Sequence, residues 1–255
     1  MQDEATPLGS MKLSRAGASV AAMANKSSTK EVQRLRTVYE LYRASPEKWN
    51  PGNAGNAAIA TERNEVIVKS LRAGGVWPLR GYRVLDVGCG GGSLLQFFAT
   101  LGAAPSDLYG IDLLPDRVAV AKESFPGINF CVGNAEEMNF PAEFFDVITL
   151  FTVFSSIFSA DMRANLVREI SRVVRPGGVV LIYDFRVPSL VNWNTRPVSR
   201  RAVRRLFGTA PVYAESLTLI PPLARRLGRL TDPWYRRLAV LSPLRTHNLI
   251  LIRLL

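Results

Sequence analysis

The sequence has very little cysteine and histidine, with two cysteines and one histidine among 255 residues. Two cysteines cannot form a disulfide framework, and both read as small buried thiols of a reducing compartment. We therefore expect a cytoplasmic protein. A single histidine excludes a histidine-rich metal site, and no metal is predicted. The chain also lacks any apolar run of the ~18 residues that a membrane-spanning helix needs.

Acidic residues are scarce in the last quarter of the chain. Residues 196–255 contain twelve arginines but only Glu215 and Asp232, and they carry most of the net charge of +11. The rest of the chain is nearly neutral. A basic region of this kind favours contact with nucleic acid, an anionic membrane surface or a phosphorylated ligand.

Glycine is concentrated in one stretch, VLDVGCGGGS, at residues 84–93. An apolar run at 82–87 reads as a buried strand, and the residues after the glycines show helical spacing of apolar side chains. A ligand can approach the backbone of such a turn because glycine has no Cβ, and the following helix offers unpaired N–H groups. The turn alone is weak evidence, since dinucleotide-binding domains contain a similar one.

Two acids accompany the glycine turn. Asp86 stands two residues before its first glycine, and Asp112 ends a second predicted strand 20 residues after Gly92. A carboxylate at the end of a strand can accept hydrogen bonds from the hydroxyls of a ribose. The sequence therefore predicts a nucleoside-containing ligand at this edge of a parallel sheet.

Together these segments resemble the class I S-adenosylmethionine-dependent methyltransferases. Five motifs occur in the order of that family: VLDVGCGGG, GIDLLPDRVAVAK, GNAEEMNF, FFDVITLFTVFSSI and RVVRPGGVVLIYDF. The resemblance covers about residues 81–185. It extends more loosely to bacterial enzymes that methylate sugars or other small secondary metabolites.

The resemblance implies an α/β fold with a Rossmann-like seven-stranded sheet, mostly parallel with an antiparallel last strand, and helices on both faces. The expected strands are 82–87, 108–112, 128–132, 144–150, 179–184, 212–220 and 247–254. We divide the chain into a disordered leader (1–28), an N-terminal helical lid (29–75) and a methyltransferase domain (76–255). That domain contains a basic helical insertion at about 221–242.

S-adenosylmethionine is the cofactor that the resemblance implies. Gly88, Cys89 and Gly90 would give backbone approach to its methionine part. Asp86 would order the turn that these residues form.

The remaining implied cofactor contacts follow the next strands. Asp112 would take the ribose hydroxyls, and Leu113 would pack on the adenine. Asn134 and Ala135 would border the adenine edge. The family often has an aspartate where Asn134 stands, but an amide can also pair with adenine. The ring of Phe151 either faces the sulfonium by cation–π attraction or packs in the core.

The segment before the first strand often covers the cofactor in this family. Tyr39, Tyr42, Trp49 and Arg63 are therefore candidate lid residues or contacts of the cofactor's carboxylate. The aromatic side chains fit packing on the sheet equally well.

A hydroxyl acceptor usually needs a general base or a metal. Asp184 ends a predicted strand and His247 begins the predicted antiparallel one, so both should lie at the edge where ligands bind. We predict that they face one pocket, where Asp184 orients His247 as the base. The alternative is that His247 caps its strand and Asp184 pairs with Arg186.

The predicted function is methylation of a small-molecule acceptor, in the form of O-methylation of a sugar, glycan or secondary metabolite. The alternatives are an RNA methyltransferase that uses the basic C-terminal region and a non-catalytic S-adenosylmethionine-binding protein. FTVFSS stands at 151–156, where methyltransferases of nucleic-acid amino groups often carry an Asn/Asp-Pro-Pro-aromatic motif. No RNA-binding module is visible either, so nucleic acid is not a predicted partner.

The insertion at 221–242 mixes arginines with Leu, Trp and Tyr, as an interfacial helix does. This composition predicts weak association with an anionic membrane surface. The alternative is that its apolar side caps the substrate pocket while the arginines are solvated.

Overall fold

The computed structural model of the chain describes residues 15–43, 48, 50–189 and 192–255. A single seven-stranded sheet, in the order β3-β2-β1-β4-β5-β7-β6, forms its centre. The strands are β1 (Val84–Val87), β2 (Leu108–Asp112), β3 (Asn129–Val132), β4 (Phe145–Phe151), β5 (Val174–Phe185), β6 (Pro211–Leu219) and β7 (Arg245–Arg253). Strands β1 to β5 pair in parallel, whereas β7 pairs antiparallel with both β5 and β6. The predicted sheet, with its antiparallel last strand, is confirmed.

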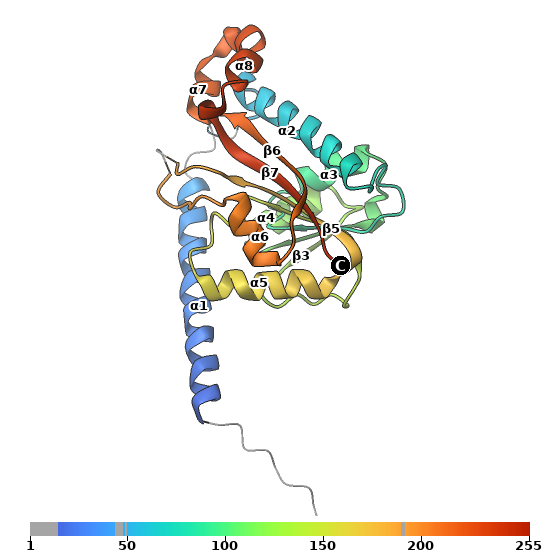
Figure 1. Cartoon of the computed structure of the whole chain (residues 1–255), viewed down its shortest axis with the longest axis vertical. Coiled ribbons are helices and arrows are strands. Elements are labelled where there is room, and N and C mark those ends of the chain that lie inside the picture. The colour runs from blue at the N-terminus through green and yellow to red at the C-terminus, as the bar shows by residue number, and fades with distance from the viewer. Residues whose placement is uncertain (1–14, 44–47, 49, 190–191) are drawn as a thin grey trace, which may run out of the picture.

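Helices cover both faces of this sheet (Figure 1). They are α1 (Arg15–Arg43), α2 (Ala54–Ala73), α3 (Ser93–Thr100), α4 (Pro115–Ser124), α5 (Ala160–Val173), α6 (Arg200–Phe207), α7 (Pro221–Arg226) and α8 (Thr231–Ala239). One hydrophobic core lies between the sheet and α2, α3 and α4. A second core lies on the other face, against α1, α5 and α6.

Alternation along β5 shows how the strands serve both cores. Leu181 and Tyr183 belong to the core under α2 and α3, whereas Val180 and Ile182 belong to the core under α5. Side chains alternate because a strand has a period of two residues. A strand that is buried on both faces needs the continuous apolar run by which these strands were predicted.

The N-terminal part of the structure corrects one prediction. Helix α1 begins at Arg15, so the residues from 15 to 28 are helical rather than a disordered leader. Five alanines at 15–24 favour this helix, because alanine has the highest helix propensity. Residues 1–14, the rest of the predicted leader, lie outside the described residues.

The segment between β6 and β7 is helical but broken. Helix α7 and helix α8 are separated at Gly228, whose φ of +52° suits glycine. Both helices contact α2, and they lie at the end of the molecule opposite to the free end of α1 (Figure 1). Within the described residues, no helix is both long and apolar enough to span a bilayer.

Candidate cofactor and acceptor site

The glycine turn after β1 lies at the carboxyl edge of the parallel strands. Gly88 has a φ of +74°, and a Cβ there would approach the Val153 side chain to 2.9 Å. The amides of Gly88 and Cys89 donate to the carbonyl of Ile111 at 2.8 and 3.1 Å, which ties the turn to β2. The Cys89 side chain belongs to the buried core, and burial raises the pKa of its thiol. Only glycine fits at 88, and Cys89 contributes its backbone.

Asp112 stands beside this turn at the end of β2. Its Oδ2 accepts a hydrogen bond from the Gly90 amide at 2.8 Å, and its Oδ1 accepts one from the Leu114 amide at 2.9 Å. Each carboxylate oxygen has a second acceptor site, so Asp112 can hold the turn and still accept from a diol. Leu113 is half-buried against the same core as Ala135. These positions fit the predicted contacts with ribose and adenine.

Asp86 is buried on β1, and its hydrogen bond joins two strands. Thr149 on β4 donates to Oδ1 of Asp86 at 2.6 Å. Burial raises the pKa of Asp86 to about 7; the Thr149 hydrogen bond and the Arg63 cation oppose this rise, whereas the charge of Asp112 adds to it. This bond links β1 to β4, and the role of Asp86 in ordering the glycine turn stays a prediction.

Arg63 reaches this edge from α2. Its guanidinium carbon is 6.0 Å from the ring centroid of Phe151, and its positive charge acts on the carboxyl of Asp86. Its Nε is buried and has no hydrogen-bond partner among the described residues. A buried donor without an acceptor is costly, and a carboxylate is the strongest neutralising partner for a guanidinium. Arg63 therefore fits the predicted contact with the cofactor's carboxylate.

Helix α1 borders the site through aromatic side chains. The guanidinium of Arg117, on α4, lies 4.9 Å from the ring centroid of Tyr39. Tyr42 donates to the side-chain oxygen of Asn192, which follows β5, at 2.9 Å. These contacts fasten α1 to segments on two sides of the carboxyl edge, as a lid requires, although closure of a lid stays a prediction. Trp49 lies outside the described residues.

Asn134 and Ala135 follow β3, close to Asp112. The Gly133 amide donates to the Asp112 carbonyl at 3.0 Å. The Asn134 side chain is occupied locally, since it accepts from the Glu136 amide at 3.1 Å and donates to the Glu136 carboxylate at 3.0 Å. This local turn competes with any pairing to adenine. The adenine contact of Asn134 stays a prediction.

Asp184 and His247 do not face one pocket. In the pairing of β5 with β7, Asp184 lies opposite Asn248, and Phe185 lies opposite His247. His247 therefore shares a face of the sheet with Phe185, because paired residues project to the same side. Tyr183 lies on that face too, and its ring stacks on the imidazole of His247, with 4.7 Å between the ring centroids and an angle of 4° between the ring planes. Asp184 projects to the other face, so the predicted pair is wrong.

Asp184 holds the loop that follows β4. Its Oδ2 accepts from the Ser155 amide at 3.0 Å, and its Oδ1 accepts from the Phe185 amide at 2.8 Å. Burial raises the pKa of Asp184 to about 6. Thr152, in the same loop, has a φ of +58°, a strained value that is common near functional sites. Asp184 is thus a residue that positions this loop.

His247 is a neutral, buried imidazole. Burial, together with the smaller effect of the Arg63 cation, lowers its pKa to about 3. Its Nδ1 lies 2.9 Å from the hydroxyl oxygen of Thr246. A general base works best with a pKa near the working pH, so this imidazole is a weak base. Its catalytic role stays a prediction, now without an orienting carboxylate.

A row of rings crosses the carboxyl edge, and only two of its members, Phe151 and His247, were predicted from the sequence as site residues. Centroids are 5.3 Å apart between Phe151 and Tyr183, 4.7 Å between Tyr183 and His247, and 4.1 Å between His247 and Phe185. Phe151 itself packs against the core under α2 and α3. The alternation in YDF at 183–185 was the available signal, because it places two rings on one face.

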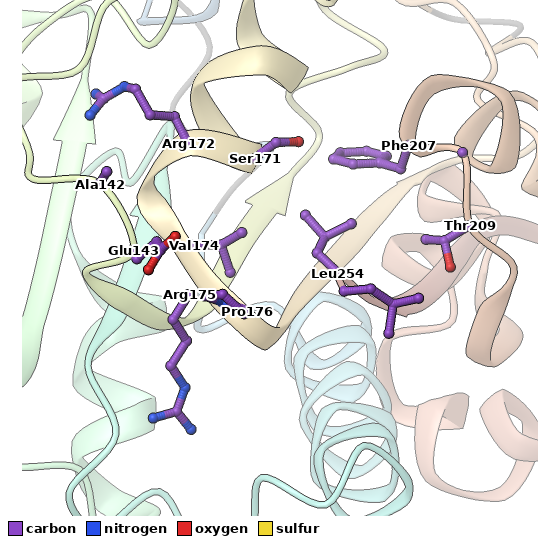
Figure 2. A pocket seen from close by; sticks show the side chains of 12 residues that line it. Ala142, Glu143, Ser171, Arg172, Val174, Arg175, Pro176, Phe207, Thr209 and Leu254 are labelled. Atoms are coloured by element: carbon purple, nitrogen blue, oxygen red, sulfur yellow. The ribbon is translucent and has the colours of Figure 1, made fainter.

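The pocket drawn in Figure 2 is a different place. It has a volume of ≈ 580 Å³ and lies where β5 begins, at the amino edge of the parallel strands. Arg172 and Arg175 point away from Phe207 there (Figure 2). Both are also paired, Arg172 with Glu169 at 2.8 Å and Arg175 with Asp146 at 2.5 Å. The motifs therefore locate the candidate site at the opposite edge.

In the described part of the chain, no three potential His, Cys, Asp or Glu ligands gather as a metal site would require.

The order of the strands, the glycine turn after β1 and the acid at the end of β2 are features of the class I S-adenosylmethionine-dependent methyltransferase fold. Residues 85–182 match the family described as "Methyltransferase domain". This match covers less than half of the chain, from β1 into β5, and a methyltransferase domain of this kind implies S-adenosylmethionine as its cofactor.

Two relatives show where the similarity lies. A ubiquinone biosynthesis O-methyltransferase of Azorhizobium caulinodans is 35% identical over 109 residues, which cover 41% of this chain and 41% of that protein. Erythromycin 3''-O-methyltransferase of Saccharopolyspora erythraea is 31% identical over 169 residues, which cover 59% of this chain and 52% of that protein. The chain thus spans about half the length of these curated relatives or less.

A solved structure supports the fold. The S-adenosylmethionine-dependent methyltransferase from Mesorhizobium loti superposes with a TM-score of 0.54 at 16% identity, covering 72% of this chain and 96% of that chain. At this identity the likeness concerns the fold.

Proposed function

We propose that the protein transfers the methyl group of S-adenosylmethionine to a hydroxyl of a small molecule. The observation that carries the proposal is the meeting, at one sheet edge, of a glycine turn held by Asp112 and the unpartnered Nε of Arg63. Both relatives described above are named as O-methyltransferases of small molecules, which supports oxygen as the acceptor atom.

The residues at this edge fit the cofactor. Asp112 has free acceptor sites for the ribose hydroxyls, and Arg63 has a buried donor for the methionine carboxylate. The positive φ of Gly88 favours glycine there, so the turn offers its backbone to the methionine part. When bound, S-adenosylmethionine supplies a sulfonium methyl group for in-line displacement.

The chain's own contribution to the reaction is mainly alignment. Helix α1 and the loop after β4 border the site, and Asp184 fixes that loop through the Ser155 amide. Correct alignment of two reactants supplies roughly 7–11 kcal/mol of a barrier. We keep His247 as the group that takes the hydroxyl proton, but its low pKa makes it a weak base. Alignment therefore carries most of the rate.

The test is transfer of a labelled methyl group from S-adenosylmethionine to a panel of acceptors. The panel holds catechols and glycosides with free hydroxyls, the same compounds with blocked hydroxyls, matched amines, and total RNA. We expect label only on the free hydroxyl compounds, with its position read by mass spectrometry. Label on RNA or only on amines would contradict the proposal, and cofactor binding without any transfer would favour a non-catalytic protein.

Variants on α2 connect the activity to the site. Arg63→Met should lower kcat/KM about tenfold or more, because the cofactor loses a charged partner. Arg72→Met is the matched control, since Arg72 lies on the same helix but stacks on Trp77 at 5.0 Å, away from the turn.

In His247→Gln, a fall in kcat of less than about 10²-fold is expected if alignment dominates, as a full general base contributes 10²–10⁴-fold.

A further inference from the structure

Large apolar side chains are exposed on the helical segment between β6 and β7. Four of the ten exposed ones in the described chain fall within residues 230–241. Their exposed fractions are 56% for Leu230, 45% for Trp234, 71% for Val240 and 52% for Leu241. We call these four side chains the apolar patch. Single exposed apolar residues are ordinary, whereas such a concentration marks an interaction surface.

The apolar patch is separate from the side of the segment that packs on the protein. Tyr235 and Ala239 are buried in a small core that also holds Leu223, Leu227 and Leu238, against Ala58 and Ile59 of α2. Packing on α2 therefore accounts for one apolar side of the segment only. The second side faces outward, and the structure leaves it uncovered.

Arginines occur in the same segment as the apolar patch. Residues 221–242 contain five arginines and one acid, Asp232. The guanidinium of Arg237 lies 5.6 Å from the ring centroid of Trp234. Arg236 pairs with Glu65 at 2.8 Å, but this pair is largely exposed, and exposed pairs contribute little. The surface thus joins apolar side chains to an excess of positive charge.

We propose that the apolar patch and its arginines dock the protein on an anionic lipid bilayer. The four apolar side chains enter the headgroup region, and the guanidinium groups pair with lipid phosphates. Trp and Arg suit this depth, because each has an apolar body and a polar end. A second copy of the chain would bring like charges together, and nucleic acid would leave the apolar side chains without a partner.

Hydrogen bonds join the segment that carries the apolar patch to α2, the helix that carries Arg63. Glu62 of α2 accepts from the Tyr235 hydroxyl of α8 at 2.7 Å and from the Thr218 amide of β6 at 2.8 Å. Arg63 follows Glu62 in the chain, so the docked helices and the proposed cofactor contact share one helix. If the proposed function holds, an amphiphilic acceptor in the bilayer would meet the site at the membrane surface.

Co-sedimentation with vesicles tests the docking directly and needs neither cofactor nor acceptor. The full chain is mixed with vesicles of phosphatidylcholine alone, or of phosphatidylcholine with phosphatidylglycerol, at low and at high salt. We expect binding to the anionic vesicles that weakens at high salt. The double variant Trp234→Ser/Leu241→Ser should bind at least about tenfold more weakly, because it loses apolar area that the bilayer buries in the docked state.

Two control variants separate the patch from general properties of the surface. Val120→Ser/Val132→Ser removes two apolar side chains that are 56% and 50% exposed elsewhere. Arg201→Gln/Arg205→Gln removes charge from α6, which is basic but lacks the patch. Both controls should keep most of the binding, and circular dichroism checks that each variant is folded.

Three results would overturn the proposal. One is the absence of binding to anionic vesicles at low salt, and another is an equal loss of binding in the α6 control. The third is a concentration-dependent dimer, or retained RNA, that the patch variant abolishes while vesicle binding persists. Because vesicle binding is measured without S-adenosylmethionine, a failure here leaves the proposed function intact, and failure of the methyl-transfer test leaves the docking intact.

Discussion

Burial at the carboxyl edge shifts the pKa values of the acidic and basic side chains in opposite directions. The pKa of Asp86 rises to about 7 and that of Asp184 to about 6, whereas the pKa of His247 falls to about 3. In each case the low-dielectric surroundings favour the neutral form. Burial at this edge therefore reduces the charge that these side chains carry, and a cationic sulfonium would meet a neutral imidazole there.

His247 gives a pH-dependent stability that can be measured. Its pKa is about 3 in the folded chain and 6.5 when unperturbed, so the folded state binds fewer protons between these values. Its contribution to stability is present above pH 6.5 and is lost as the pH falls, by about 1.4 kcal/mol per unit. Urea unfolding at pH 7 and pH 5 should show that wild type loses about 2 kcal/mol more than His247→Gln. Equal losses would contradict a buried neutral histidine.

Asp184 should affect the structure of the loop rather than the proton transfer. Asp184→Asn keeps one acceptor oxygen but presents an amide to the second backbone N–H, so we expect a loss of about 1–3 kcal/mol in the free energy of unfolding. The rate should fall without a change in the pKa values of the pH–rate profile. A profile that loses its basic or acidic limb would instead assign Asp184 to the chemistry.

At the level of elements, β1 to β4 were predicted within a few residues, because each is an apolar run that leads into a motif. β5 begins at Val174 instead of 179, since its pairing with β4 resumes across a bulge. The glycine turn and Asp112 were also located from the sequence. The faces of Asp184 and His247 were not, because register between distant strands depends on tertiary pairing, and a slip of one residue reverses every side chain.

Glu62 of α2 joins this helix to α8 and β6 by hydrogen bonds, and its removal should weaken these contacts. Its carboxylate accepts from the Tyr235 hydroxyl and from the amide of Thr218, a residue with a strained φ of +70°. Glu62→Ala leaves both donors without this acceptor, so we expect about 1–3 kcal/mol less stability. Glu65→Ala, on the same helix, removes only the exposed pair with Arg236 and should cost less than about 1 kcal/mol. Urea unfolding that shows equal losses would contradict the link.

Over the whole molecule, the positive charge is concentrated in the C-terminal part of the chain, whereas the candidate site is built mainly from other elements. Most of the net charge of +11 lies in residues 196–255, where twelve arginines face two acids. Five of these arginines belong to the lobe of α7 and α8 at one end of the molecule (Figure 1). The candidate site is built from the central strands and α2. The proposed docking surface and the candidate site thus occupy different parts of one fold.

Cofactor affinity is the most direct test of the central claim, which is that S-adenosylmethionine binds at the edge formed by the glycine turn and Asp112. Titration calorimetry compares wild type with Asp112→Asn and Asp146→Asn. Asp146 is the matched control, because it is also a buried strand carboxylate that accepts a backbone amide, from Arg83 at 2.6 Å, but it lies at the amino edge. Asp112→Asn should raise the Kd by about 5- to 150-fold, equivalent to about 1–3 kcal/mol, while Asp146→Asn should leave it nearly unchanged. An unchanged Kd in folded Asp112→Asn, or an equal rise in both variants, would contradict the account.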